Sequence, residues 1–280
     1  MMRKIFWLIG LASCLLSCGK RKTVNTSPEE PARPKIMVRV MTYNIYGARA
    51  SSGPPANLEA LAKVINQEKP DLVALQEVDV YTRRTGVNVH QAAELAKLTG
   101  MDWYFTKAMD VTGGEYGDAV LSRLPILERK RYALPVAPDI GGEFRTMAMI
   151  RVKKDGREFY FASTHLDHLA QEDSRLLQAA ELKKAVTELG KPLILGGDFN
   201  AIPASQTIGI MRSFMNLGCL QQCPLTFPSD KPDRTIDYIM TTPVNRFSVT
   251  RYNNISGYDE VLKVYVSDHR AIVADISVQE

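Results

Sequence analysis

The sequence contains a short apolar run that leads directly into two glycines, an acid and an amide, residues 193–200 (LILGGDFN). Three consecutive apolar residues between Pro192 and the glycines predict a short strand that is buried on both faces. Because side chains alternate along an extended chain, Asp198 and Asn200 point the same way and Phe199 turns into the core. A carboxylate and a carboxamide at one sheet edge suit a site that activates water beside an electrophile. A plain Gly-Asp turn with a local Asn hydrogen bond is the structural alternative.

The remainder of the chain alternates strand and helix patterns without an internal repeat. With 45% hydrophobic and 24% charged residues, it has the composition of a globular protein with a large core. Strands are expected over residues 36–46, 71–77, 102–107, 116–123, 126–134, 144–153, 157–165, 193–197, 235–241, 246–252 and 269–278. Helices are expected over residues 58–69, 89–98, 174–188 and 204–215. This mixture predicts one α/β domain, residues 35–280, with two sheets and outer helices.

The N-terminus has the pattern of an export signal. Arg3 and Lys4 precede an apolar run over residues 5–16 that is too short to span a bilayer. The run ends in LLSC, which resembles a bacterial lipobox and predicts a lipoprotein signal peptide over residues 1–18 with lipidation of Cys18. An ordinary cleaved signal peptide is the alternative. Either reading predicts an exported protein of the bacterial cell envelope, and the first anchors it to a membrane on the periplasmic or outer surface.

Residues 19–34 are polar and contain Pro28, Pro31 and Pro34, which predicts a tether between the anchor and the domain. The net charge of the chain is +4, and residues 1–34 hold six basic and two acidic residues, a net of +4. The difference leaves about zero for residues 35–280, without the basic excess expected of a protein that binds nucleic acid mainly through phosphates. A nucleic-acid partner is therefore not favoured. We expect a monomer.

Polar residues recur where the predicted strands end. Any one of them has a structural explanation, such as a turn residue, a helix cap or a core histidine. Strand ends are, however, where sheet proteins assemble sites, so the whole set predicts a shared site. Its members are Asn44, Glu77, His165, Asp198, Asn200, Asp237, Asp268 and His269.

This ordered set resembles the endonuclease/exonuclease/phosphatase superfamily, which has the deoxyribonuclease I-like fold. The resemblance runs through MTYNI (41–45), LQEV (75–78), YGDAVLSR (116–123), STHL (163–166), GDFN (197–200), IDYI (236–239) and SDHR (267–270). It covers almost all of residues 36–280. It implies a four-layer fold, a two-sheet β-sandwich flanked by outer helices, and a metal-dependent hydrolase of phosphoester bonds.

The same resemblance implies a metal site on Asn44 and Glu77, with Asp268 beside the metal or the attacking water. One carboxylate and one amide oxygen suit Mg²⁺, which keeps much of its water, with Mn²⁺ or Ca²⁺ as alternatives. A metal at this place would help to neutralise the charge that develops on a phosphate under attack.

By the same resemblance, Asp198 orients or deprotonates the attacking water and Asn200 helps to hold it. His165 and His269 contact the scissile phosphate, and Asp237 orients His269. An Asp partner keeps an imidazole in one tautomer and favours its protonated form.

Three further residues are predicted to bind substrate. Arg145 resembles the phosphate-contacting arginine of the family, although a surface charge on a strand is the alternative. Tyr116 and Asp118 lie in the YGDAVLSR motif, where an amide or small residue is expected in place of Asp118. Loop residues that could also line the cleft are Arg83, Arg84, Lys231 and Arg234.

Several alternatives stay open from the sequence alone. A zinc hydrolase could use His165, Asp167 and His168, although zinc usually requires three or four nitrogen or sulfur ligands. A non-catalytic binding lipoprotein and an extracellular nuclease of the same superfamily are the others. Within the hydrolase reading, we expect a small or lipid-linked phosphodiester as substrate. Cys219 and Cys223, four residues apart, form a disulfide outside the cytoplasm or remain as two thiols.

Overall fold

The computed structural model describes residues 35–50, 57–243 and 246–279. Lys35–Glu280 forms one compact unit. The predicted signal peptide over residues 1–18, the lipidation site Cys18 and the tether over residues 19–34 lie outside the described residues. No helix within the described residues has the length and apolar character needed to cross a membrane.

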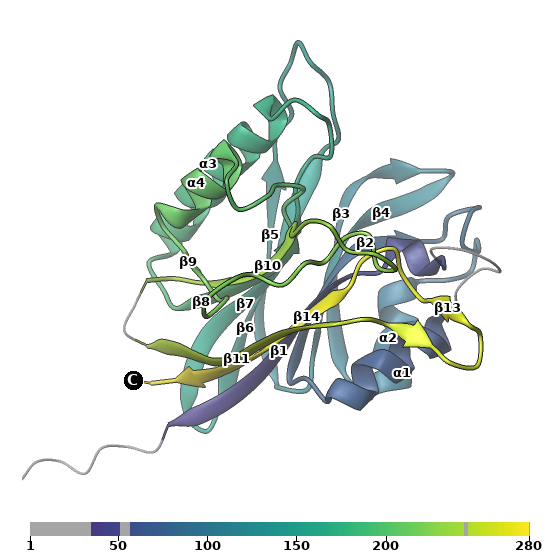
Figure 1. Cartoon of the computed structure of the whole chain (residues 1–280), viewed down its shortest axis with the longest axis horizontal. Helices are drawn as coiled ribbons and strands as arrows, with labels where there is room; N and C mark the ends of the chain where they lie inside the picture. The colour runs from purple at the N-terminus through teal and green to yellow at the C-terminus, as the bar shows by residue number, and fades with distance from the viewer. Residues whose placement is uncertain (1–34, 51–56, 244–245, 280) are drawn as a thin grey trace, which may run out of the picture. The chain divides into compact units, whose positions relative to one another are not determined.

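Two mixed sheets of six strands each form the centre of the unit (Figure 1). The first sheet has the order β11-β14-β1-β2-β4-β3 and the second has the order β5-β6-β7-β8-β10-β9. One parallel pair lies within each sheet, β1 with β2 and β7 with β8, and the other pairs are antiparallel.

The strands of the first sheet are β1 Ile36–Asn44, β2 Leu72–Val80, β3 Asp102–Val111, β4 Gly114–Ser122, β11 Phe247–Ile255 and β14 Ala271–Val278. Those of the second sheet are β5 Ile126–Leu134, β6 Arg145–Lys154, β7 Arg157–His165, β8 Leu193–Asp198, β9 Asn216–Leu217 and β10 Asp237–Thr241. A separate two-stranded sheet pairs β12 (Tyr258–Asp259) with β13 (Val264–Tyr265).

Three layers of apolar side chains hold these elements together. The inner core lies between the sheets, where Val38 and Val40 of β1 pack with Phe161 of β7 and Ile194 of β8. The opposite face of β1 packs against helices, because Met41 belongs to a second core with residues of α1 and α2. Apolar residues on both faces of a strand are expected where a sheet is covered on both sides.

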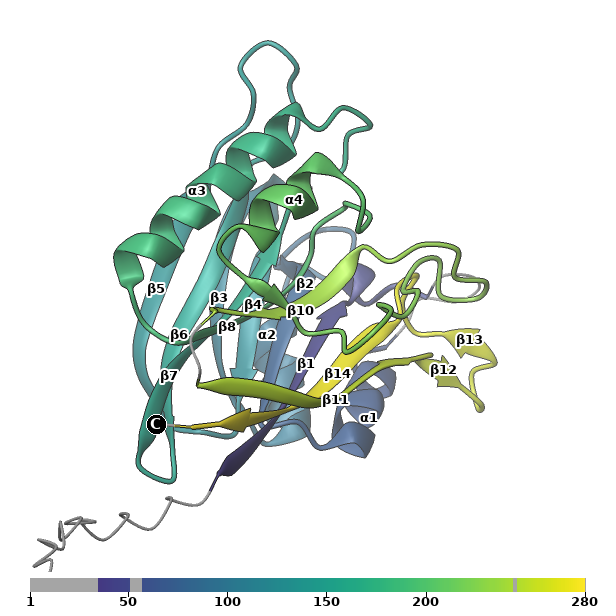
Figure 2. The ribbon, with the colours of Figure 1, turned by 60° about the vertical axis from the view of Figure 1, so that its left-hand side comes forward.

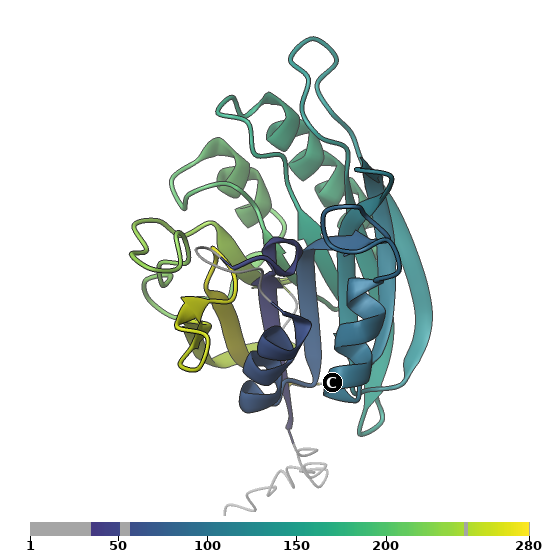
Figure 3. The ribbon, with the colours of Figure 1, turned by 90° about the vertical axis from the view of Figure 1, so that its right-hand side faces the viewer.

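The helices cover the outer faces of the two sheets. Helices α1 (Leu58–Glu68) and α2 (Gln91–Thr99) pack on the first sheet (Figure 3). Helices α3 (Asp173–Leu189) and α4 (Gln206–Arg212) pack on the second (Figure 2). A single turn of 3₁₀ helix, η1 (Tyr46–Ala48), follows β1. The predicted four-layer architecture is therefore confirmed.

Local signals account for the ends of the helices. The side chain of Asn57 accepts a hydrogen bond from the Ala60 N–H at 2.7 Å and begins α1. Gly100 and Gly190 end α2 and α3 in the left-handed conformation, which glycine adopts without a steric penalty. Helix α4 is shorter than the predicted 204–215, because it begins at the Ser205 cap and ends at Arg212.

Strand β2 differs from the prediction in a way that matters for the site. It continues to Val80 instead of ending at Glu77, because a bulge between Leu75 and Val78 lets it resume pairing with β4. Glu77 sits in this bulge with a φ of 57°. The last strand, in contrast, starts at Ala271, so Asp268 and His269 lie in the preceding loop.

Candidate active site

Adjacent strands of the second sheet bring three of the predicted site residues together. Asp198 at the end of β8 is in register with His165 at the end of β7 and with Asp237 at the start of β10. The neighbouring sheet contributes Asn44 at the end of β1, and its amide Nδ2 lies 3.0 Å from Asp198 Oδ2. The predicted residues therefore meet at one end of the sandwich, across both sheets.

Asp198 occupies the middle of this group and is almost fully buried. Its Oδ2 atom lies 3.5 Å from Nε2 of His165 and 3.6 Å from Nε2 of His269. Its Oδ1 atom accepts the backbone N–H of Asn200 at 2.8 Å. Burial and repulsion from Asp237 raise the pKa of Asp198 to about 7.

His269 is held between carboxylates. Its Nδ1 lies 2.9 Å from Asp237 Oδ2, and the ring of Phe227 packs against it with centroids 4.8 Å apart. Burial alone would lower the pKa of His269, but the charges of Asp237 and Asp198 outweigh this effect and raise it to about 10. His269 is therefore an imidazolium at neutral pH, with Nε2–H facing Asp198.

His165, unlike His269, is uncharged at neutral pH. Burial and the neighbouring Arg145 hold the pKa of His165 well below its ordinary value. Arg145 Nη1, which can only donate, lies 3.0 Å from His165 Nδ1. The Asn200 side-chain nitrogen lies 3.0 Å from His165 Nε2. Since a neutral imidazole has a single acceptor nitrogen, only one of these two donors forms a hydrogen bond with the ring. The two histidines thus flank Asp198 as one neutral and one charged ring.

Two site residues depend on left-handed backbone conformations. Asn200 has a φ of 47°, a region that Asn tolerates better than most residues. Glu77 has a φ of 57°, which is costly for a longer side chain and is stabilised here by the surrounding sheet. The preceding residue, Gln76, is buried and donates to Ser163 Oγ of the second sheet at 2.8 Å. This contact fixes the bulge that carries Glu77.

The carboxylates at this end suit a divalent cation. Glu77 and Asp268 both line the cavity, and Glu77 Oε1 accepts from Asn44 Nδ2 at 3.1 Å. Burial raises the pKa of Asp268 to about 6, with a further contribution from Glu77. Crowded carboxylates with an adjacent carboxamide are the hard oxygen donors that Mg²⁺, Mn²⁺ and Ca²⁺ prefer. In this structure the Asn44 amide oxygen accepts from the Tyr46 N–H, so its nitrogen faces Glu77.

Asp198, Asp237 and His269 form a second group of possible metal ligands. Atoms of Asp198, Asp237 and His269 lie within 4.8 Å of one another, close enough to hold an ion. The Nδ1 atom of His269 is already engaged by Asp237. Glu77 and Asp268 line the same cavity as Asp198 and His269.

The site opens into a cavity of about 780 Å³ that several arginines line. Arg145 is only 2% exposed, so it is not a surface charge. Its guanidinium lies 2.5 Å from Glu143 Oε2, and Nη1 donates to the Tyr116 hydroxyl at 3.2 Å. Arg84 and Arg234 also line the cavity, whereas the other loop cations considered, Arg83 and Lys231, do not.

Asp118 lies behind the cavity and not in its wall. Its side chain is 1% exposed, and Oδ2 accepts from Thr146 Oγ1 at 3.1 Å. Burial raises the pKa of Asp118 well above its ordinary value. A direct contact between Asp118 and substrate is therefore not part of this arrangement, because Asp118 is buried and does not line the cavity.

The three residues of the zinc alternative do not converge. Asp167 is buried, and its carboxylate accepts the backbone N–H groups of Glu143 and Leu169 at 2.7 and 2.9 Å. His168 is largely exposed, with Nδ1 directed at Glu143 at 3.6 Å. His165 Nε2 lies 3.5 Å from Asp198 Oδ2. His165, Asp167 and His168 do not form a group of ligand atoms close enough to share an ion.

Phe227 and Arg175 are among the cavity residues that the sequence did not predict. Phe227 packs on His269, and Arg175 of α3 lines the cavity while donating to the Asp167 carbonyl at 3.0 Å. Neither residue follows a strand or belongs to one of the recognised motifs. No local signal distinguishes an aromatic residue in the loop before Pro228, or an arginine on a helix, from ordinary surface residues.

A sequence profile of the Endonuclease/Exonuclease/phosphatase family matches residues 41–269. The chain belongs to this family. It is therefore a hydrolase of phosphoester bonds, in a family whose enzymes typically depend on a divalent metal. No curated protein sequence matches the chain.

Solved structures show the same fold at low sequence identity. An endonuclease/exonuclease/phosphatase family protein from Bacteroides thetaiotaomicron is 20% identical, with a TM-score of 0.69 and coverage of 88% of this chain and 100% of that chain. A mannosyl-6-phosphatase from the same organism is 20% identical, with a TM-score of 0.67 and coverage of 85% and 99%. The human Nocturnin catalytic domain is 22% identical, with a TM-score of 0.65 and coverage of 90% and 100%.

Proposed function

We propose that this protein is an exported, Mg²⁺-dependent hydrolase of small or lipid-linked phosphodiesters. One observation carries the proposal. Asp198, with a pKa of about 7, lies between a neutral His165 and a charged His269 at 3.5 and 3.6 Å, beside an arginine-lined cavity. A general base works best when its pKa lies near the working pH, and phosphoryl transfer needs cationic donors around the phosphate.

In the proposed reaction, Asp198 accepts a proton from water as the water oxygen bonds to phosphorus. The ester P–O bond breaks with its electron pair on the leaving oxygen, which departs on the side opposite the water as an alkoxide and takes a proton from solvent. Asn200 and the neutral ring of His165 hold the water and a phosphoryl oxygen. The imidazolium of His269 donates to another phosphoryl oxygen, where negative charge accumulates during the attack. Asp237 keeps His269 protonated and oriented.

Asn44, Glu77 and Asp268 are the residues that would hold Mg²⁺. For Asn44 this requires the amide oxygen to turn toward Glu77, which gives up the hydrogen bond that this oxygen accepts from the Tyr46 N–H. When bound, Mg²⁺ stabilises negative charge on the phosphoryl oxygens. Mn²⁺ and Ca²⁺ take the same oxygen ligands and are alternatives.

Export and anchoring rest on residues 1–34, with lipidation at Cys18 and a tether over residues 19–34. The Cys219–Cys223 disulfide supports an extracytoplasmic location in the bacterial cell envelope, since disulfides persist mainly there. Cys18→Ala should release the protein from the membrane fraction and remove incorporation of labelled palmitate. Membrane association that survives this substitution would contradict the lipid anchor.

The catalytic proposal is tested with bis(p-nitrophenyl) phosphate and Mg²⁺. Asp198→Asn keeps the shape of the site but removes the base, so kcat should fall by about 10²- to 10⁴-fold. Asp102→Asn is the matched control, because Asp102 is exposed, pairs with Arg129, accepts the Trp103 N–H and does not line the cavity. Full activity of Asp198→Asn would rule out the assigned role.

The substrate class needs a separate panel, run in one Mg²⁺ buffer. It compares DNA with lipid, nucleotide and sugar phosphodiesters. We expect DNA to be a poor substrate, because residues 35–280 carry almost no net charge. DNA cleavage far faster than that of the small esters would favour the nuclease alternative.

A further inference from the structure

A second cavity of about 720 Å³ adjoins the candidate active site. Ile202 and Arg234 line both cavities, so the two share a wall. Ile202 lies only two residues beyond Asn200, which places the shared wall next to the water-holding end of the site. The reaction proposed above uses no residue of the second cavity.

The second cavity presents apolar side chains to solvent. Ile202 is 48% exposed and Leu225 is 40% exposed, and Met215 and Leu217 contribute deeper apolar surface. Contiguous exposed apolar surface in a concave site marks a place where ligands bind. Arg234 brings no uncompensated charge, because its Nε lies 3.2 Å from Asp233 Oδ1.

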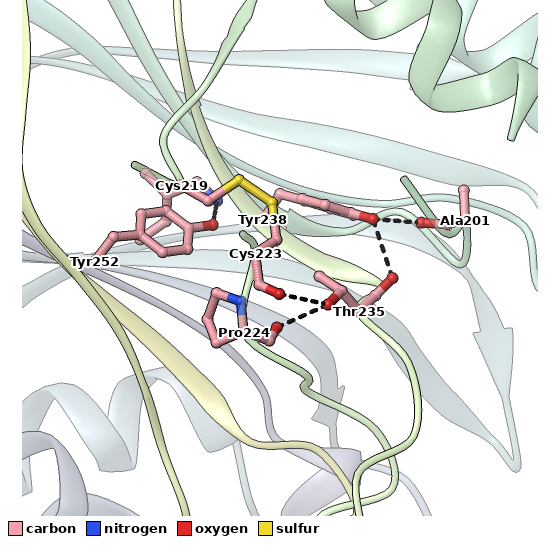
Figure 4. Close-up of a disulfide and its surroundings, with 8 residues drawn as sticks. Ala201, Cys219, Cys223, Pro224, Thr235, Tyr238 and Tyr252 are labelled. Carbon is pink, nitrogen blue, oxygen red and sulfur yellow. Dashed lines mark hydrogen bonds between the residues drawn. A yellow bond between two sulfur atoms is a disulfide. The ribbon is translucent and has the colours of Figure 1, made fainter. Parts of the chain in front are cut away.

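The walls of this cavity are tied to each other by buried hydrogen bonds (Figure 4). The Tyr238 hydroxyl lies 2.9 Å from the Ala201 carbonyl and 3.0 Å from the Thr235 carbonyl. Thr235 Oγ1 lies 2.8 Å from the carbonyl of Pro224, which precedes Leu225. Tyr238 is fully buried, so this network is shielded from water.

A disulfide forms part of the same wall. Cys219 and Cys223 are bonded to each other, with Cα atoms 5.0 Å apart, and both line the second cavity. Thr235 Oγ1 also contacts the Cys223 carbonyl at 3.3 Å. The sequence left a disulfide and free thiols open, and the structure contains the disulfide. The cavity is therefore preformed, which reduces the conformational entropy lost on ligand binding.

We propose that the second cavity binds an apolar substituent, alkyl or aryl, of the phosphoester substrate. This proposal rests on the hydrolase function proposed above and adds the chemical class of the group esterified to the phosphate. The phosphate lies against Asp198 and the arginines, and the apolar group passes over Ile202 to reach Leu225. Ile202 and Leu225 then determine specificity without touching the reacting atoms.

The test uses two diesters that differ only in chain length, methyl and hexyl p-nitrophenyl phosphate. Leu225→Ser removes apolar surface from the cavity. Leu220→Ser is the matched control, because Leu220 lies in the same segment, is 59% exposed and does not line the cavity. Both leucines are solvent-accessible, so neither substitution disturbs the core.

The wild-type protein should prefer the hexyl ester in kcat/KM by at least about tenfold, from the apolar surface that the longer chain buries. Leu225→Ser should lower kcat/KM for the hexyl ester by about three- to tenfold and leave the methyl ester unchanged. Leu220→Ser should change neither value. Equal rates for both esters, or equal effects of the two leucine substitutions, would overturn the proposal.

Binding separates this inference from the hydrolase function. Calorimetry with hexylphosphonate and methylphosphonate in Mg²⁺ buffer needs no turnover. If neither diester is hydrolysed but hexylphosphonate binds more tightly and Leu225→Ser removes the difference, the cavity assignment stands and the proposed reaction fails. If hydrolysis proceeds but both phosphonates bind equally, the reaction stands and the cavity assignment fails.

Discussion

The Nδ1 atom of His269 lies 2.9 Å from Oδ2 and 3.2 Å from Oδ1 of Asp237. The two residues come from a loop before the last strand and from the start of β10, 32 positions apart. Both are buried, so the charge of the carboxylate acts on the ring with little screening. This pair sets the charge state of the ring that faces Asp198.

Asp237→Asn tests the pair directly. An amide can still accept a hydrogen bond, but it no longer supplies the charge that holds His269 protonated. We expect kcat to fall by about 10²-fold or more, as in other His–Asp pairs. Asp275→Asn serves as the control, because Asp275 binds Arg39 at 2.6 Å and lines none of the cavities described. An Asp237→Asn protein with full activity would contradict the role of this pair.

Removal of metal should abolish turnover, and Mg²⁺ should restore it. Glu77→Gln should raise the Mg²⁺ concentration for half-maximal activity by more than about tenfold, the scale seen for groups that support a metal ligand. Glu128→Gln is the control, because Glu128 pairs with Arg151 and Lys130 on the second sheet. Activity that persists in EDTA would exclude a divalent metal from the reaction.

His90 should make stability depend on pH. Its Nδ1 accepts from the Ala93 N–H at 3.4 Å and begins α2, and burial lowers the pKa of His90. The unfolded chain therefore binds a proton more readily than the folded one, so stability is present above the ordinary pKa and is lost as pH falls below about 6.5. His90→Asn keeps a cap and should flatten part of this slope in urea unfolding. Parallel slopes for both proteins would contradict the assignment.

The first glycine of the GGDFN segment has a packing role. A Cβ at Gly196 would lie 2.8 Å from Ala74 Cβ and 3.0 Å from Thr42 Cβ, between the two sheets. Gly196→Ala should therefore lower the free energy of unfolding by about 1–3 kcal/mol. Gly209→Ala in α4 is the matched control, because nothing lies within 4 Å, and it should stabilise the protein by about 0.5–1 kcal/mol. Equal effects would contradict the packing argument.

The positions of Asp198, His165 and Asp237 could be predicted from sequence, because each directly adjoins an apolar strand whose pattern is local. Side-chain alternation and buried runs depend only on near neighbours along the chain. The same holds for the Asn57 cap of α1 and for the glycines that end α2 and α3. The four-layer fold followed from the order of these elements together with the resemblance to a family, and it is confirmed.

Only the tertiary structure decided how Glu77, Arg145 and Asp118 are used. Glu77 faces the cavity because a bulge in β2 gives it a positive φ, and no local pattern marks that bulge. Arg145 is buried against His165, whereas Asp118, in a family motif, lies behind the cavity wall. The shared wall of the two cavities likewise joins segments distant in sequence. Strand register and packing between sheets are non-local, so a single sequence determines which residues can form the site but not which of them face the substrate.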